Sequence, residues 1–75
     1  MKKNAKAAPL SRLSPREFEV LNLVVDGRTS KEIAAIVGVK PASINTYRSR
    51  IMAKLEIGDI PSLVRFAIRQ GLIKP

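Results

Sequence analysis

The sequence predicts an all-α fold, a compact bundle of four helices in one small domain. Apolar residues recur at the three- and four-residue spacing of helices, and no useful length alternates with a period of two. Residues suited to capping a helix precede three of the four apolar segments, and Gly follows three of them. The chain has 75 residues, enough for a single domain that buries about 60% of its unfolded surface.

The first helix is expected to begin after Ser14 and to end at Gly27. Ser14 suits the N-cap, and Glu17, three residues later, completes a capping box. Gly27 can adopt the left-handed conformation that commonly ends a helix. The residues expected to face the core share helical spacing: Phe18, Val20, Leu21, Val24 and Val25.

A second and a fourth helix follow the same design. Thr29 and Glu32 form another capping box, and Gly38 ends that helix. The fourth helix is expected from Asp59 or the next residue to residue 70, before Gly71. The residues expected inside these two helices are apolar: Ile33, Ala34, Val37, Leu63, Val64, Ala67 and Ile68.

Residues 1–12 are expected to form a flexible basic arm before the ordered domain, residues 13–73. The arm has four cations, no acid and a proline. Either it contacts DNA phosphates or it is a linker. Its start resembles the basic region of a secretory signal, but Lys6 and Pro9 interrupt it before an apolar stretch develops, so we expect a cytoplasmic protein.

Composition narrows the classes of function. Lys and Arg outnumber Asp and Glu by 14 to 6, giving a net charge of +8. Such a charge attracts nucleic acid first and anionic membranes second, although a merely solvated basic surface also fits it. The absence of Cys and His excludes disulfides, the usual zinc sites and His-based catalysis. No apolar run approaches the ~18 residues of a membrane span. We therefore expect no enzyme, no cofactor and no membrane partner.

The third helix, about residues 41–55, is expected to form a helix-turn-helix with the second. Ala34 is small enough for a crossing helix, and Gly38 allows a tight turn. Seven residues fit the pattern of this motif: Ile33, Ala34, Val37, Gly38, Val39, Ile44 and Tyr47. A purely structural helical hairpin is the competing interpretation, but such a hairpin seldom matches all seven.

The outward face of this helix predicts contact with DNA bases. At about 100° per residue, Ile44, Tyr47, Ile51 and Leu55 share the core side. The opposite side carries short residues: Ala42, Asn45, Thr46, Ser49 and Ala53. The amide and hydroxyl groups of Asn45, Thr46 and Ser49 can hydrogen-bond base edges, and Asn can pair bidentately with adenine. An ordinary solvated face would carry Glu–Lys pairs, and residues 38–55 contain no acid.

Several neighbouring groups are candidates for the DNA backbone. Arg48, Arg50 and Lys54 flank the outward face. The start of the second helix offers free N–H groups to an anion, through Thr29, Ser30 and Lys31. Lys40 is a poor cap for the third helix, which leaves N–H groups that a phosphate can satisfy.

The stretches LSPREFEVL, SKEIA, SINTY and IMAKL give the chain a resemblance to the LuxR-type (GerE-type) DNA-binding domain of NarL/FixJ-like response regulators. The resemblance covers residues 13–73. It implies a third helix in the major groove, base contacts at Asn45, Thr46 and Ser49, and backbone contacts that include Tyr47. It also implies either a free-standing regulator or, as we prefer, the output domain of a two-component response regulator. Lys40, Asn45 and Tyr47 depart from common family residues, which affects the target sequence and not the fold.

The fourth helix predicts a homodimer on DNA. It has more apolar surface than one buried stripe needs, which suits either a dimer interface or tighter packing against the first helix. The expected interface residues are Leu63, Val64, Phe66 and Ile68. RNA polymerase is a candidate partner. The alternative function is a helical protein-interaction adaptor that uses this same side; RNA binding fits less well, because only three aromatic residues are present.

Overall fold

Four α-helices and one turn of 3-10 helix make up residues 10–73, the part of the chain that the computed structural model describes. The elements are η1 (Leu10–Arg12), α1 (Pro15–Val25), α2 (Ser30–Val37), α3 (Pro41–Leu55) and α4 (Ile60–Arg69). No strand occurs within residues 10–73. The predicted all-α fold is therefore confirmed, and the helix bounds lie within a residue or two of those expected from the caps.

Local hydrogen bonds explain where the helices begin. In the capping box of α1, Ser14 N–H donates to Glu17 Oε1 at 2.8 Å and Glu17 N–H donates to Ser14 Oγ at 3.1 Å. Thr29 and Glu32 repeat this reciprocal pair at α2. Asp59 accepts from the backbone N–H of residue 62 at the start of α4. These predicted caps are confirmed, because capping depends on neighbours only three residues away.

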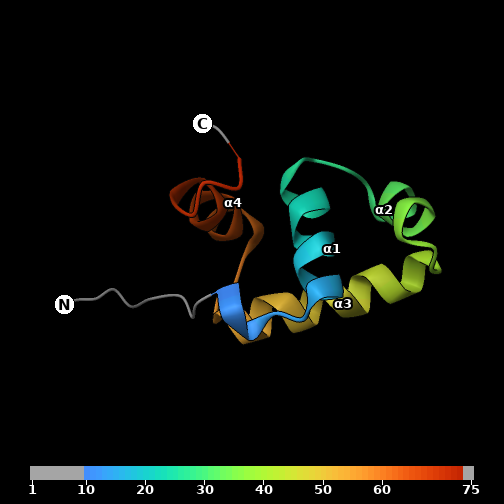
Figure 1. Cartoon of the computed structure of the whole chain (residues 1–75), viewed down its shortest axis with the longest axis horizontal. Helices are drawn as coiled ribbons and strands as arrows, with labels where there is room; N and C mark the ends of the chain where they lie inside the picture. The colour runs from blue at the N-terminus through green and yellow to red at the C-terminus, as the bar shows by residue number, and fades with distance from the viewer. Residues whose placement is uncertain (1–9, 74–75) are drawn as a thin grey trace.

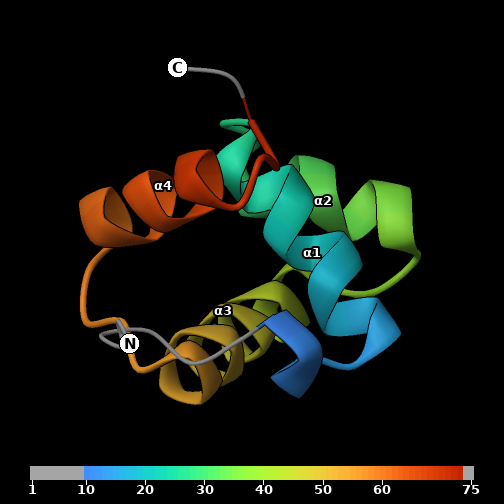
Figure 2. The same ribbon diagram turned by 60° about the vertical axis from the view of Figure 1, so that its left-hand side comes forward.

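The longest helix, α3, lies along one side of the molecule, and the other helices stand over it (Figure 1). Helix α2 lies near its N-terminal end, α1 crosses near its middle, and α4 lies toward its C-terminal end (Figures 1 and 2). Both α1 and α2 contact α3, and α4 contacts α1. None of the helices within residues 10–73 combines the length and apolar character that crossing a membrane requires.

The hydrophobic core lies between α3 and the helices above it. Its apolar residues are Val20, Leu21, Val25, Ile33, Ala34, Val37, Ile44, Ile51, Leu55, Leu63, Phe66 and Ala67. One expectation for α1 was wrong, since Phe18 is 37% exposed; Val24 is half-buried and packs against the core. The inward face passes instead through Glu17, which is 4% exposed. A carboxylate can occupy this position because its Oε1 accepts from the Ser14 backbone N–H and from the Lys54 ammonium.

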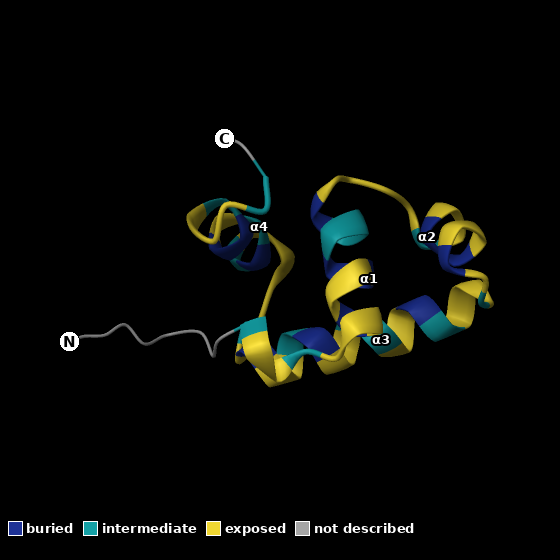
Figure 3. Ribbon diagram, viewed as in Figure 1, coloured by how far each residue is buried: buried dark blue, intermediate teal, exposed yellow. Residues whose placement is uncertain are grey.

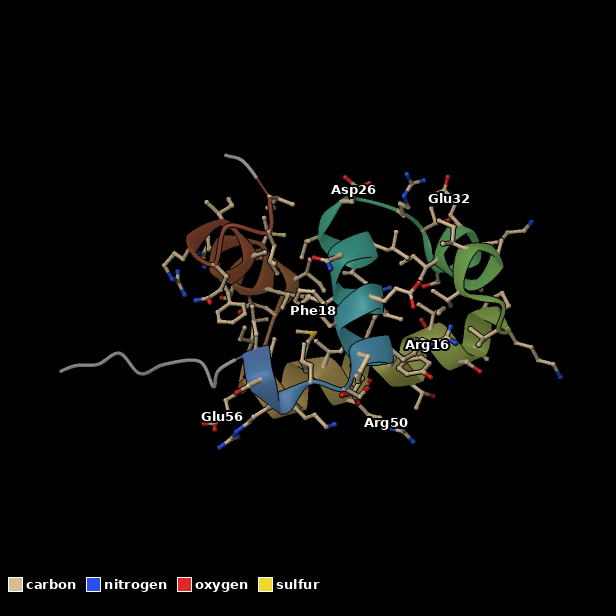
Figure 4. All side chains as sticks on the ribbon, in the orientation of Figure 1. Arg16, Phe18, Asp26, Glu32, Arg50 and Glu56 are labelled. Carbon is tan, nitrogen blue, oxygen red and sulfur yellow. The ribbon has the colours of Figure 1, made fainter. Side chains whose placement is uncertain are left out.

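The turn between α2 and α3 has the geometry expected for Gly38. Its φ is +78°, and its N–H donates to Ala34 O at 2.9 Å. Arg16 strengthens this end of α2 from outside, since its Nη1 donates to Val37 O at 2.6 Å (Figure 4). The turn is thus held both by its own backbone and by a side chain of α1.

A short element precedes α1 and contacts the rest of the fold. Leu10–Arg12 form η1, and Leu10 packs against the core. Arg12 Nη1 contacts Glu56 Oε2 at 3.3 Å and Lys54 O at 3.4 Å, beyond the end of α3. These contacts lie just before the expected domain start at residue 13, which stays a prediction. The rest of the predicted arm, residues 1–9, lies outside the described residues.

Candidate nucleic-acid interface

The two helices of the predicted helix-turn-helix pack as the sequence pattern requires. Ala34 is 2% exposed and Ile44 is fully buried, so the helices meet closely at these positions. Val39 and Tyr47 are half-buried and pack against the same core. The turn of three residues, 38–40, then directs α3 away from α2. The arrangement is a helix-turn-helix followed by one further helix.

Helix α3 presents a polar face to the outside of the molecule. Asn45, Thr46 and Ser49 are all exposed, whereas Ile51 and Leu55 are at most 1% exposed. Figure 3 shows this alternation of exposed and buried turns along α3. The three predicted base-contacting residues therefore lie on one accessible face, and no other helix of the described chain covers it.

Positive charge on this side of the molecule is not neutralised within the described residues. No carboxylate of residues 10–73 lies within 4.0 Å of a charged nitrogen of Lys31, Lys40, Arg48 or Arg50. Arg50 extends from α3 away from α1, and the carboxylates of Asp26 and Glu32 lie at the opposite side of the molecule (Figure 4). Because Arg48 and Arg50 of α3 have no carboxylate partner within residues 10–73, they give this helix a positive field that attracts a polyanion. Lys31, Lys40 and Arg50 are also exposed.

Lys54, one of the predicted backbone-contacting residues, forms an ion pair within the chain. Its Nζ lies 2.7 Å from Oε1 of the buried Glu17 carboxylate on α1. The hydrogen bond from Lys54, followed by that from the Ser14 backbone, lowers the pKa of Glu17 below its ordinary value of 4.5. The Lys54 side chain is 43% exposed, but its ammonium is paired with the buried Glu17 carboxylate. Nothing local in the sequence signals this pair, because its members are 37 residues apart.

The start of α2 is joined to α3 by three polar side chains. Ser30 Oγ donates to Asn45 Oδ1 at 3.3 Å and accepts from Arg48 Nη1 at 3.2 Å. Thr29, by contrast, uses both its N–H and its hydroxyl oxygen in the capping box with Glu32. At this end of α2, Lys31 stays exposed and its ammonium has no carboxylate partner within residues 10–73. Lys40 makes no side-chain capping bond to α3, as expected.

Two shallow hollows flank the outward face of α3. One is lined by Ser43, Thr46, Tyr47 and Arg50, all of which carry hydrogen-bond donors. The other is lined by Asn45, Arg48, Ser49, Met52 and Ile60. Sequence reasoning missed Ser43 and Met52, although turning 100° per residue places both on these flanks. It also missed Ile60, for which the sequence has no signal because the residue comes from α4.

The structure corrects the residues expected at a dimer interface. Leu63 and Phe66 are 2% and 3% exposed and belong to the core of the single chain, so they are not available to a second copy. The reason is that α4 faces α1 through residues 63, 66 and 67, which leaves the neighbouring stripe outside. That stripe consists of Ile60, Val64 and Ile68, which are spaced four residues apart; Ile60 is exposed, and Val64 and Ile68 are half-buried.

The second helix of this helix-turn-helix is basic and presents short polar side chains to the outside. This arrangement is typical of the class of domains that insert a helix into the major groove of DNA. The family described as bacterial regulatory proteins, luxR family (GerE), matches residues 11–67. The chain belongs to this family of transcription regulators, as the resemblance predicted. Its described fold and its helix-turn-helix are those of a LuxR-type domain.

Related proteins agree with this assignment. The chain is 39% identical to the transcriptional regulatory protein MctR of Rhizobium johnstonii, over 81% of this chain and 28% of MctR. It is 36% identical to the transcriptional regulatory protein FixJ of Bradyrhizobium diazoefficiens, over 89% of this chain and 33% of FixJ. The crystal structure of full-length FixJ from B. japonicum superposes with a TM-score of 0.78, at 34% identity, covering 85% of this chain and 32% of FixJ. The chain thus spans about a third of the length of these relatives.

Proposed function

We propose that this chain regulates transcription by binding double-stranded DNA at specific sequences, with α3 in the major groove. The observation that carries the proposal is the exposure of Asn45, Thr46 and Ser49 on a face of α3 that no described element covers. Their amide and hydroxyl groups can donate to and accept from base edges. Because the proposed role is recognition, it requires neither a catalytic group nor a cofactor.

The phosphate contacts that we propose surround this face. Arg50 and the Tyr47 hydroxyl share one flanking hollow, and Lys31 and Lys40 stand at the starts of α2 and α3. Arg48 lies half-buried between the two helices, and the backbone N–H of Ser30, the first residue of α2, is the group that we propose for a phosphate there. Such contacts position a protein on the duplex and make its affinity sensitive to salt. We omit Lys54 and Thr29 because the fold already uses their side chains.

We further propose that two copies bind together through α4. Ile60, Val64 and Ile68 form a partly exposed apolar stripe of the kind that a second helix can cover. A symmetric pair would place two α3 helices in successive major grooves, so the half-sites would lie about one helical turn apart, or a multiple of it. This arrangement also predicts that the target is palindromic.

The relatives suggest the larger protein in which such a domain works. MctR and FixJ carry names of transcriptional regulatory proteins, and this chain matches only about a third of each. We propose that the chain is the output domain of a response regulator, or otherwise a free-standing regulator of the same family. RNA polymerase is then a candidate partner on DNA. Since bacterial DNA lies in the cytoplasm, the proposed role includes a cytoplasmic location.

Selection of bound duplexes from a random DNA pool at physiological salt tests the proposed function. Wild type should enrich a defined site with two half-sites at a fixed spacing. Asn45→Ala or Ser49→Ala should weaken binding to that site by about 1–3 kcal/mol and relax the preference at one base pair. A protein-interaction adaptor would instead enrich no sequence and bind all DNA weakly. Absence of any enriched site would therefore reject sequence-specific binding.

A further inference from the structure

The side-chain amide of Asn45 is joined to α2 by one hydrogen bond from Ser30, whose hydroxyl accepts a second hydrogen bond from Arg48. Ser30 Oγ lies 3.3 Å from Asn45 Oδ1 and 3.2 Å from Arg48 Nη1. A guanidinium group can only donate, so Ser30 Oγ accepts from Arg48. The single hydrogen of the Ser30 hydroxyl then remains for Asn45 Oδ1. The amide is thus anchored through its oxygen.

Two sources of positive charge favour this orientation of the amide. Ser30 is the first residue of α2, where the positive end of the helix dipole lies. Arg48 adds a full charge on the other side of the same hydroxyl. The oxygen of an amide carries partial negative charge and its NH₂ group partial positive charge, so the oxygen is attracted toward α2. The NH₂ group of Asn45 is left to face outward on the exposed side of α3.

We infer that Ser30 is a positioning residue that makes Asn45 a hydrogen-bond donor toward DNA bases. Bidentate pairing with adenine needs the Asn oxygen as acceptor and its NH₂ group as donor together, whereas guanine offers two acceptors, O6 and N7. With the oxygen held by Ser30, Asn45 selects guanine over adenine at the base pair that it reads. This inference rests on the proposed function, since it concerns a residue proposed to contact bases.

Binding to a set of matched duplexes tests this role. The duplexes carry either guanine or adenine at the one base pair where Asn45→Ala relaxes the preference of the selected site. Wild type should bind the guanine duplex more tightly. In Ser30→Ala the amide is free to rotate, so the ratio of the two affinities should shift toward adenine by about five- to tenfold, the discrimination of one hydrogen bond. Ser30→Thr retains a hydroxyl and should keep the wild-type ratio.

The ratio of the affinities for the guanine and adenine duplexes distinguishes a positioning role of Ser30 from a structural or phosphate-binding role. Thr29 supplies the cap of α2, so Ser30→Ala should remain folded, which circular dichroism checks. A lost phosphate contact would weaken both duplexes alike and leave their ratio unchanged. A further duplex replaces adenine by purine, which lacks the N6 amino group. That replacement should change the affinity of wild type by less than about twofold. It should weaken binding by Ser30→Ala, because in this variant the freed Asn45 oxygen accepts from N6 of adenine.

Each outcome decides the inference. It is overturned if wild type prefers adenine, if Ser30→Ala keeps the wild-type ratio, or if Asn45→Ala relaxes no base pair. In these cases selection of a site by wild type still supports the proposed function. Uniform binding of wild type to every duplex would reject the proposed function and, with it, any role for Ser30 in base preference.

Discussion

Lys54 Nζ lies 2.7 Å from Glu17 Oε1, which joins the last turn of α3 to the first turn of α1. Glu17 also closes the capping box at the start of α1, so one carboxylate serves both the helix and the contact between helices. Its 4% exposure means that little water could replace either partner. One contact between α3 and α1 is therefore made by a cation that the sequence alone assigned to the DNA-binding set.

Replacing Lys54 should destabilise the fold more than replacing another lysine. Lys54→Met keeps the apolar stem but leaves the Glu17 carboxylate without its cation. We expect a loss of about 1–2 kcal/mol in the free energy of unfolding, at the lower end for a buried charge because Lys54 itself is 43% exposed. Lys31→Met, at an exposed site, should change it by no more than about 0.5 kcal/mol. If Lys54→Met and Lys31→Met lowered the free energy of unfolding equally in urea, the pair of Lys54 with Glu17 would contribute nothing to stability.

The same pair makes stability depend on acidic pH. The pKa of Glu17 is lowered in the folded state from its ordinary value of 4.5. As the pH falls, the unfolded chain takes up this proton first, so the stabilisation is complete above 4.5 and is lost as the pH falls through the lower folded-state value. Urea unfolding of wild type and Glu17→Gln should therefore differ most near neutral pH. The difference should shrink below about pH 4.5.

This comparison isolates Glu17 from the other carboxyls. The backbone N–H of Ser62 lowers the pKa of Asp59 as well, but Asp59 is present in both proteins and cancels in the difference. A difference in stability that stays constant from neutral pH to about pH 3 would show that the charge of Glu17 is not what stabilises the fold.

Arg50 should act on DNA affinity and not on base preference. Arg50→Gln removes one exposed cation from the flank of α3, so binding should weaken on all duplexes alike. The slope of log K against log salt should fall in magnitude by about 0.9, the value for one phosphate contact. Arg28→Gln removes the same charge from the far side of the molecule, where Arg28 Nε lies 3.3 Å from Asp26 Oδ2. An equal change of slope in both variants would indicate an effect of net charge without local contact.

The helices and the outward face of α3 could be predicted from the sequence because both depend on local rules. Capping boxes join residues three apart, so Ser14 and Thr29 identified the starts of α1 and α2 correctly. A period of 3.6 residues likewise separates the buried Ile44 from the exposed Thr46 and Ser49 whatever the rest of the fold does.

Features that depend on tertiary contacts could not be predicted from these local rules. Helix α4 has two adjacent apolar stripes, and only its packing against α1 decides that Phe66 is buried and Val64 partly exposed. The pairs of Glu17 with Lys54 and of Ser30 with Asn45 join residues from different helices. The end of α3 at Leu55 was predicted, but the left-handed conformation of Glu56 after it was not, since a Gly is common at that position.

The two stripes of α4 should respond differently to substitution. Leu63→Ala creates a cavity in the core and should cost about 2–4 kcal/mol of unfolding free energy. Val64→Gln leaves the net charge and most of the core unchanged, so its stability should stay within about 1 kcal/mol of wild type. It should nevertheless weaken binding to a duplex with two half-sites while sparing a duplex with one. Equal loss on both duplexes would count against pairing through this stripe.

The left-handed conformation of Glu56 should carry a measurable cost. Its φ is +58°, where the Cβ of an L-residue is crowded by the following carbonyl, a penalty of about 1–2 kcal/mol that Gly escapes. Glu56→Ala and Glu56→Gly both remove the exposed contact with Arg12, so that loss cancels between them. We expect the Gly variant to be more stable than the Ala variant by about 1 kcal/mol in thermal unfolding, less than the full penalty because Gly has more freedom when unfolded. Equal melting temperatures would show that the end of α3 relaxes away from the left-handed conformation when Ala replaces Glu.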